Sequence, residues 1–82
     1  MNTGQNAQLL VVEDEPKVAT FIKKGLQTQS YSVSIAPTGE DAKSLLARTR
    51  FDLIILDVNL PDITGLELAE YIRNQPSQVP IL

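Results

Sequence analysis

The sequence predicts an α/β fold in which a parallel sheet carries helices on both faces. Two observations predict this fold class. Residues 9–12 (LLVV) and 53–56 (LIIL) are short uninterrupted apolar runs, which are typical of strands buried on both faces. Segments in which apolar residues recur at helical spacing alternate with the strand-like segments along the chain. Such alternation implies right-handed crossovers, which should place the first helix on one face and the next two on the other.

The first strand, residues 9–12, is followed by a helix that we expect over residues 16–29. Pro16 suits the first helical turn, and either Asp14 or Glu15 could cap the start of the helix. A stripe of apolar side chains at helical spacing supports this helix and consists of Val18, Phe21, Ile22 and Leu26. The polar residues 1–8, which precede the strand, are expected to form a flexible N-terminal arm.

The second strand and second helix are predicted from a change in the apolar pattern. Residues 31–36 (YSVSIA) alternate polar and apolar side chains, which fits a half-covered or edge strand. Thr38 and Asp41 resemble a capping box, so we expect a helix to begin after Thr38 and to reach about Thr49. The apolar face of this helix consists of Ala42, Leu45 and Leu46.

The last part of the chain is expected to add a strand, a helix and the start of another strand. Residues 53–56 are the third strand, and the Pro and Gly of residues 58–65 (VNLPDITG) indicate a loop. A third helix should cover residues 65–74, with some combination of Leu66, Leu68, Ala69 and Ile72 facing inward. Residues 79–82 (VPIL) fit the start of a fourth strand.

The composition excludes several classes of function. The net charge is −3 and the seven basic residues are scattered, so we expect no nucleic-acid-binding surface in this segment. The sequence has no cysteine and no histidine, which excludes thiolate or imidazole metal sites and Cys or His catalysis. No apolar run exceeds four residues, so no membrane-spanning helix is expected, and a cytoplasmic location is the default expectation.

Acidic residues follow both of the buried strands. Glu13 and Asp14 follow the first strand, and Asp57 follows the third. Ligands of open parallel sheets bind beyond the carboxyl ends of the strands, so the three carboxylates should converge if these strands are neighbours. Three close carboxylates repel one another unless a cation is present, and an oxygen-only site suits Mg²⁺. An aspartate beside such an ion can act as a nucleophile toward a phosphoryl group.

A purely structural role for these acids is the alternative. An acid that follows a strand often caps the next helix, and this reading is attractive for Asp14 alone. It is less attractive for Asp57, because the next predicted helix begins about eight residues later. The two motifs together are much more specific than either acid by itself.

The two motifs resemble the receiver domain of bacterial two-component response regulators. They are residues 9–16 (LLVVEDEP) and residues 53–65 (LIILDVNLPDITG), and the resemblance covers residues 9–82. It implies a flavodoxin-like (CheY-like) fold with strand order 2-1-3-4-5. It also implies a phosphorelay signalling function, in which a sensor histidine kinase is the partner that donates the phosphoryl group.

The resemblance also assigns a role to each site residue. Asp57 corresponds to the aspartate that accepts the phosphoryl group. Asp14 and Asp57 would bind Mg²⁺ directly, and Glu13 would act largely through water. The backbone carbonyl of Asn59 corresponds to a further ligand. The resemblance therefore implies a signalling domain rather than an enzyme, and the expected cofactor is Mg²⁺.

The sequence ends at Leu82, before the Ser or Thr and the Lys that contact the phosphoryl group in this family. Residues 9–82 are therefore expected to be a partial receiver domain, truncated after the start of strand four and impaired in phosphorylation. An open strand edge at residues 79–82 predicts a homodimer, with the first helix also in the interface. The alternatives are an inactive structural fragment that self-associates, or an aspartate-nucleophile phosphatase. A phosphatase would require an acid two residues after Asp57, where this sequence has Asn59.

Overall fold

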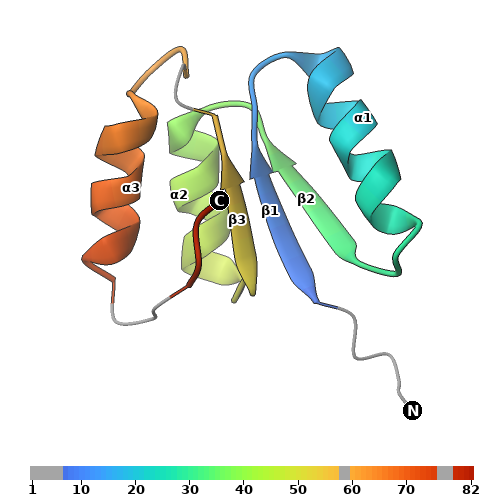
Figure 1. The fold of residues 1–82 in the computed structure, drawn as a ribbon. Coiled ribbons are helices and arrows are strands. Elements are labelled where there is room, and N and C mark those ends of the chain that lie inside the picture. The colour runs from blue at the N-terminus through green and yellow to red at the C-terminus, as the bar shows by residue number, and fades with distance from the viewer. Residues whose placement is uncertain (1–6, 58–59, 76–78) are drawn as a thin grey trace.

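The computed structural model describes residues 7–57, 60–75 and 79–82. Strands and helices alternate along this part of the chain, and the predicted α/β class is confirmed (Figure 1). The elements are β1 (Gln8–Val12), α1 (Pro16–Gln27), β2 (Ser32–Ala36), α2 (Gly39–Arg48), β3 (Leu53–Leu56) and α3 (Gly65–Arg73). Among the described helices, none is long and apolar enough to cross a bilayer.

The three strands form a parallel sheet in the order β2-β1-β3. Leu10 in β1 is paired with Ser34 of β2 on one side and with Ile54 of β3 on the other. β1, one of the two strands with a continuous apolar run, is thus central, and β2, the strand with alternating polarity, lies at the edge, as predicted. β3 carries the other apolar run, but only Ile54 is buried in it, so the prediction of a strand buried on both faces is confirmed for β1 and wrong for β3. The chain reverses its direction of progress across the sheet between β1 and β3, where ligands of such sheets bind.

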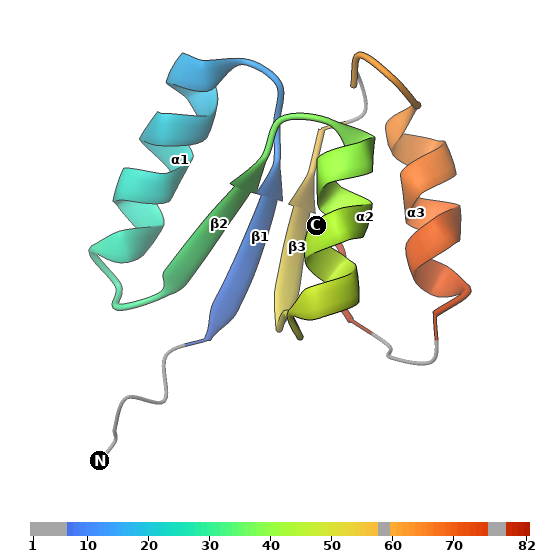
Figure 2. The same cartoon turned by 180° about the vertical axis from the view of Figure 1, so that it is seen from behind.

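Helices cover the two faces of the sheet unequally. In Figures 1 and 2, α2 and α3 lie together on one side, while α1 flanks the other. Successive side chains of β1 point to opposite faces. Leu10 and Val12 belong to the main core with α2 and α3, and the fully buried Val11 lies on the α1 side. The buried members of the main core are Leu10, Val12, Ala36, Ala42, Phe51, Ile54, Leu68, Ile72 and Val79.

The helices agree with the predicted ranges to within two residues, but α1 buries a different set of side chains. The buried residue of α1 is Ala19, while Phe21 is 80% exposed and Val18 is 43% exposed. Part of the predicted apolar stripe therefore remains exposed to solvent. In α3, Leu68 and Ile72 are buried and Leu66 is 75% exposed.

Both ends of the described chain pair with the sheet. β1 begins at Gln8, one residue before the predicted boundary, and its N–H donates to the Asp52 carboxylate at 2.7 Å. Ala7, also in the predicted arm, accepts a hydrogen bond from the Ser32 N–H at 3.0 Å, and residues 1–6 lie outside the described residues. At the other end, residues 79–82 run parallel to β3, with one bridge between Ile54 and Ile81. The predicted fourth strand is therefore present as a single bridge.

Candidate functional site

The three acids are held where β1 and β3 end side by side. Glu13 directly follows β1, and its N–H donates to the Ala36 carbonyl of β2 at 3.0 Å. Asp57 directly follows β3, and its N–H donates to the Val12 carbonyl of β1 at 3.0 Å. The backbone that carries the carboxylates is thus fixed by bonds that continue the sheet.

The carboxylates converge as the sequence predicts. One carboxylate oxygen from each of Glu13, Asp14 and Asp57 lies within 4.8 Å of the other two. Glu13 and Asp57 are half-buried, whereas Asp14 is exposed. Asn59, the fourth predicted ligand, lies outside the described residues, so its role stays a prediction.

Helix capping does not account for this cluster. The N-cap of α1 is Glu15, whose side chain accepts a hydrogen bond from the Lys17 N–H at 3.4 Å, so the alternative cap Asp14 is not used. The start of α3 is capped by a capping box between Thr64 and Glu67. The Glu67 N–H donates to the Thr64 hydroxyl at 3.1 Å, and the Thr64 N–H donates to the Glu67 carboxylate at 2.9 Å. The reading in which Asp14 caps the next helix is therefore wrong.

The electrostatics of the cluster favour a cation. Burial raises the pKa of Glu13 above its ordinary value of 4.5, and the charges of Asp57 and Asp14 raise it further. A hydrogen bond from the Glu15 N–H, at 3.1 Å, acts in the opposite direction. The site thus brings three carboxylates together, and none of its three residues offers a nitrogen or sulfur ligand. This donor set fits a hard divalent ion such as Mg²⁺.

Glu13→Gln is expected to stabilise the metal-free protein at pH 7. An acid whose pKa is raised in the folded state makes the folded state bind more protons than the unfolded state. Stability therefore falls as pH rises from 4.5 through the raised pKa, and the Gln variant lacks this loss. The gain should be up to about 1 kcal/mol, the scale of partly exposed charge interactions. Urea unfolding with a chelator present, at pH 4 and pH 7, measures it. If the free energy of unfolding of the wild-type protein and of Glu13→Gln changed equally between pH 4 and pH 7, Glu13 would not have the raised pKa.

Two structural roles in the segment after Asp57, those of Asp62 and Glu67, were missed by the sequence reasoning. Asp62, in the loop between β3 and α3, accepts hydrogen bonds from the N–H groups of Gly39 and Glu40 at 2.8 and 2.9 Å. These partners are 23 and 22 residues away, so no local pattern indicates the contact. Glu67 could have been found, because Thr64-x-x-Glu67 is the sequence signature of a capping box.

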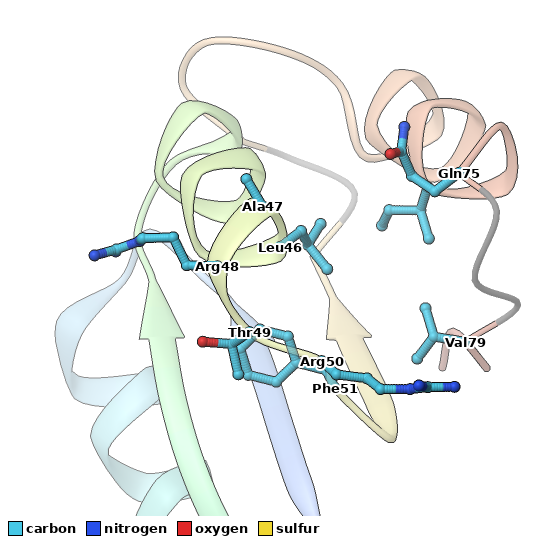
Figure 3. A pocket seen from close by; sticks show the side chains of 9 residues that line it. Leu46, Ala47, Arg48, Thr49, Arg50, Phe51, Gln75 and Val79 are labelled. Atoms are coloured by element: carbon cyan, nitrogen blue, oxygen red, sulfur yellow. The ribbon is translucent and has the colours of Figure 1, made fainter.

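An open pocket lies at the opposite end of the sheet. It has a volume of about 570 Å³ between the carboxyl ends of α2 and α3 (Figure 3). Phe51 precedes β3 and lines this pocket, whereas Asp57 follows β3, so the pocket is separate from the acidic cluster. Apolar side chains of Leu46, Ile72 and Val79 and the basic residues Arg48 and Arg50 complete most of its lining.

Residues 9–82 match the family model of the response regulator receiver domain. The chain belongs to this family. Among curated relatives of this receiver domain, the alkaline phosphatase synthesis transcriptional regulatory protein PhoP of Bacillus subtilis is 38% identical over 77 residues. That match covers 94% of this chain and 32% of PhoP. The receiver domain spans about a third of the length of the curated relatives that it matches.

Solved receiver domains have the same fold. The chemotaxis response regulator CheY4 of Vibrio cholerae superposes with a TM-score of 0.91 at 34% identity, over 94% of this chain and 66% of that one. TrrA of Thermotoga maritima, solved with Mg²⁺ and BeF, has a TM-score of 0.87 at 37% identity, over 92% and 65%. TrrA has also been solved in complex with the histidine kinase ThkA. The flavodoxin-like (CheY-like) fold is confirmed, and the family is one of signalling domains that are phosphorylated on aspartate.

Proposed function

We propose that this receiver domain accepts a phosphoryl group on Asp57, with Mg²⁺ bound beside it, from a phosphohistidine of a sensor histidine kinase. The observation that carries the proposal is the convergence of Glu13, Asp14 and Asp57 carboxylate oxygens within 4.8 Å, at the ends of neighbouring parallel strands. The complex of the similar protein TrrA with a histidine kinase supports the choice of donor.

The chemistry requires little more than a nucleophile and compensation of charge. An oxygen of the Asp57 carboxylate attacks phosphorus, and the bond between phosphorus and the histidine nitrogen breaks. The electron pair of that bond stays on the imidazole, and the product is an acyl phosphate. Both reactants carry negative charge, and a bound Mg²⁺ would supply the positive charge that offsets their repulsion. Asp14 and Asp57 would hold the ion, with Glu13 acting through water and the Asn59 carbonyl as a further ligand.

Incubation with acetyl phosphate and Mg²⁺ tests this function. We expect an adduct on Asp57 that forms only when Mg²⁺ is present. Residues 1–82 tested by themselves do not supply the Ser or Thr hydroxyl and the Lys ammonium that contact the phosphoryl group in this family. Transfer should therefore be slower than in a receiver domain that has both groups, by a factor on the order of 10²–10³. Intact-mass measurement over hours, followed by peptide mapping, detects the adduct. An adduct that forms equally with a chelator, or on another carboxylate, would contradict the proposal.

A Mg²⁺ titration followed by NMR tests the metal site without the chemistry. The amide signals of Glu13, Asp14 and Asp57 should move together as Mg²⁺ is added. Uniform shifts at all acidic residues would show nonspecific binding instead.

The alternative of an aspartate-nucleophile phosphatase is disfavoured, because Asn59 stands where that chemistry needs an acid. The homodimer and the absence of nucleic-acid binding stay predictions.

A further inference from the structure

The start of α1 is bonded to the acidic cluster through its backbone. The N–H of Glu15 donates a hydrogen bond to Oε2 of Glu13 at 3.1 Å, two residues back along the chain. Glu13 is a half-buried member of the cluster, and Glu15 is the exposed N-cap of α1. One carboxylate of the cluster is thus held in place from the helix that follows it.

The Glu15 N–H is available for this contact because α1 has no capping box. In a capping box, a Glu or Gln side chain at the third helical position accepts from the N-cap N–H. The start of α3 shows this arrangement, in which the Thr64 N–H donates to Glu67. The third position of α1 is Val18, which has no side-chain acceptor. The Glu15 N–H donates to Glu13 instead.

Both ends of the contact belong to segments that regular structure fixes. The Glu13 N–H donates to the Ala36 carbonyl of β2 at 3.0 Å, which holds this backbone at the end of the sheet. The Glu15 carbonyl accepts from the Ala19 N–H at 3.0 Å, a helical bond at the start of α1. Pro16 restricts the residue before it to extended conformations, and Glu15 has a φ of −84° and a ψ of 110°. The first turn of α1 therefore determines where the Glu15 N–H points.

A fixed carboxylate favours cation binding because a glutamate side chain is long and flexible. Ordering a free Glu side chain costs rotamer entropy. A carboxylate that is already held in the cation-free protein loses less of this freedom when the cation and its water bind. Groups that orient metal ligands in this way typically change metal affinity by about 10–100-fold.

We propose that Glu15 is a positioning residue of the cation site, whose backbone N–H holds the Glu13 carboxylate in the orientation that meets the water shell of the cation. The proposal rests on the proposed function, since it takes the cluster to be a cation site. Glu15 is not one of the three clustered acids. Its side chain accepts from the Lys17 N–H at 3.4 Å and caps α1, so its side chain and its N–H have separate roles.

Two substitutions at position 15 separate the N–H from the side chain. Glu15→Ala removes the carboxylate that caps α1 and keeps the N–H. Glu15→Pro removes the same carboxylate and also the N–H, and the observed φ of −84° is close to the value of about −65° that a proline ring imposes. The two variants have the same charge. We expect Mg²⁺ to bind Glu15→Pro about tenfold more weakly than Glu15→Ala, in an NMR titration followed at the amides of Asp14 and Asp57.

A double-mutant cycle tests whether the N–H acts through Glu13. Glu13→Ala removes the acceptor and leaves Asp14 and Asp57 as the proposed direct ligands. In this background, Glu15→Pro and Glu15→Ala should bind Mg²⁺ with equal affinity, because the N–H has no carboxylate to hold. If the difference between the two variants persisted without the Glu13 carboxylate, the proline would be disturbing the site in another way, and the proposal would be overturned.

Circular dichroism checks that each variant is folded. If Glu15→Pro does not fold, chemical synthesis of the 82-residue chain provides a second way to remove the N–H. An ester in place of the amide between Asp14 and Glu15 lacks this N–H and leaves every side chain unchanged. The ester should bind Mg²⁺ more weakly than the wild-type protein, and the two should bind equally once Glu13→Ala is present in both.

The outcomes distinguish this inference from the proposed function. If the wild-type protein shows no Mg²⁺-dependent shifts at Glu13, Asp14 and Asp57, the proposed metal site is wrong, and the inference is overturned with it. If the wild-type protein binds Mg²⁺ there and Glu15→Pro binds it as tightly as Glu15→Ala, the metal site stands and the positioning role of Glu15 is wrong.

Discussion

Asp57→Asn is expected to abolish the phosphoryl adduct completely. The amide has nearly the shape of the carboxylate but lacks the anionic oxygen that attacks phosphorus. The same change removes a proposed direct ligand of Mg²⁺. Loss of groups that merely orient metal ligands weakens binding by about 10–100-fold, so loss of a direct ligand should weaken it at least as much. Intact-mass measurement and the NMR titration provide the two readouts.

The matched control for this variant is Glu70→Gln, which makes the same chemical change on the exposed side of α3. It should be phosphorylated like the wild-type protein and should bind Mg²⁺ with similar affinity. A stable adduct on Asp57→Asn, in the presence of Mg²⁺ and acetyl phosphate, would mean that another residue is the acceptor.

Leu68→Ala is expected to destabilise the fold by about 2–5 kcal/mol, the usual cost of truncating a fully buried leucine. Leu68 belongs to α3, is 0% exposed and packs in the main core. A domain of this size is stable by only about 4–12 kcal/mol, since stability is roughly 0.05–0.15 kcal/mol per residue. The substitution should therefore remove a large share of the total and lower the midpoint of urea unfolding.

Leu66→Ala is a control within the same helix. It changes the same residue type two positions away, where the side chain is 75% exposed. Its effect on the free energy of unfolding should stay within about 0.5 kcal/mol, as is usual for surface substitutions. Equal destabilisation by the two variants would mean that α3 does not pack with the face that the structure shows.

The strands β1 and β3 were predicted from uninterrupted apolar runs that no other described element shows. In β1 the run from Leu9 to Val12 is buried on both faces, whereas in β3 only Ile54 is buried and the other three residues are half-buried. The start of α2 was predictable because the Thr38 side chain caps the helix by accepting a local hydrogen bond from the Asp41 N–H. The convergence of the three acids needed one further assumption, that β1 and β3 are neighbours, and the sheet order confirms it.

The features that escaped prediction depend on contacts between distant parts of the chain. The hydrogen bonds of Asp62 reach 22 and 23 residues back to α2, and Asp62 looks from the sequence like an ordinary loop residue. Phe21 is exposed while Ala19 on the same helix is buried, and periodicity alone does not reveal which of the apolar side chains face the sheet. Such contacts are properties of the packed molecule, so a reading of local patterns does not contain them.

The central position of β1 determines how a bound cation would affect hydrogen exchange in the protein. Its residues Leu9, Leu10, Val11 and Val12 are at most 3% exposed and pair with strands on both sides. Amides in such a strand exchange with solvent only through the largest openings of a protein. The backbone that carries Glu13 directly after β1 should therefore leave the sheet only when the whole protein unfolds. A cation bound there would slow hydrogen exchange throughout the core, because global unfolding would first have to release it.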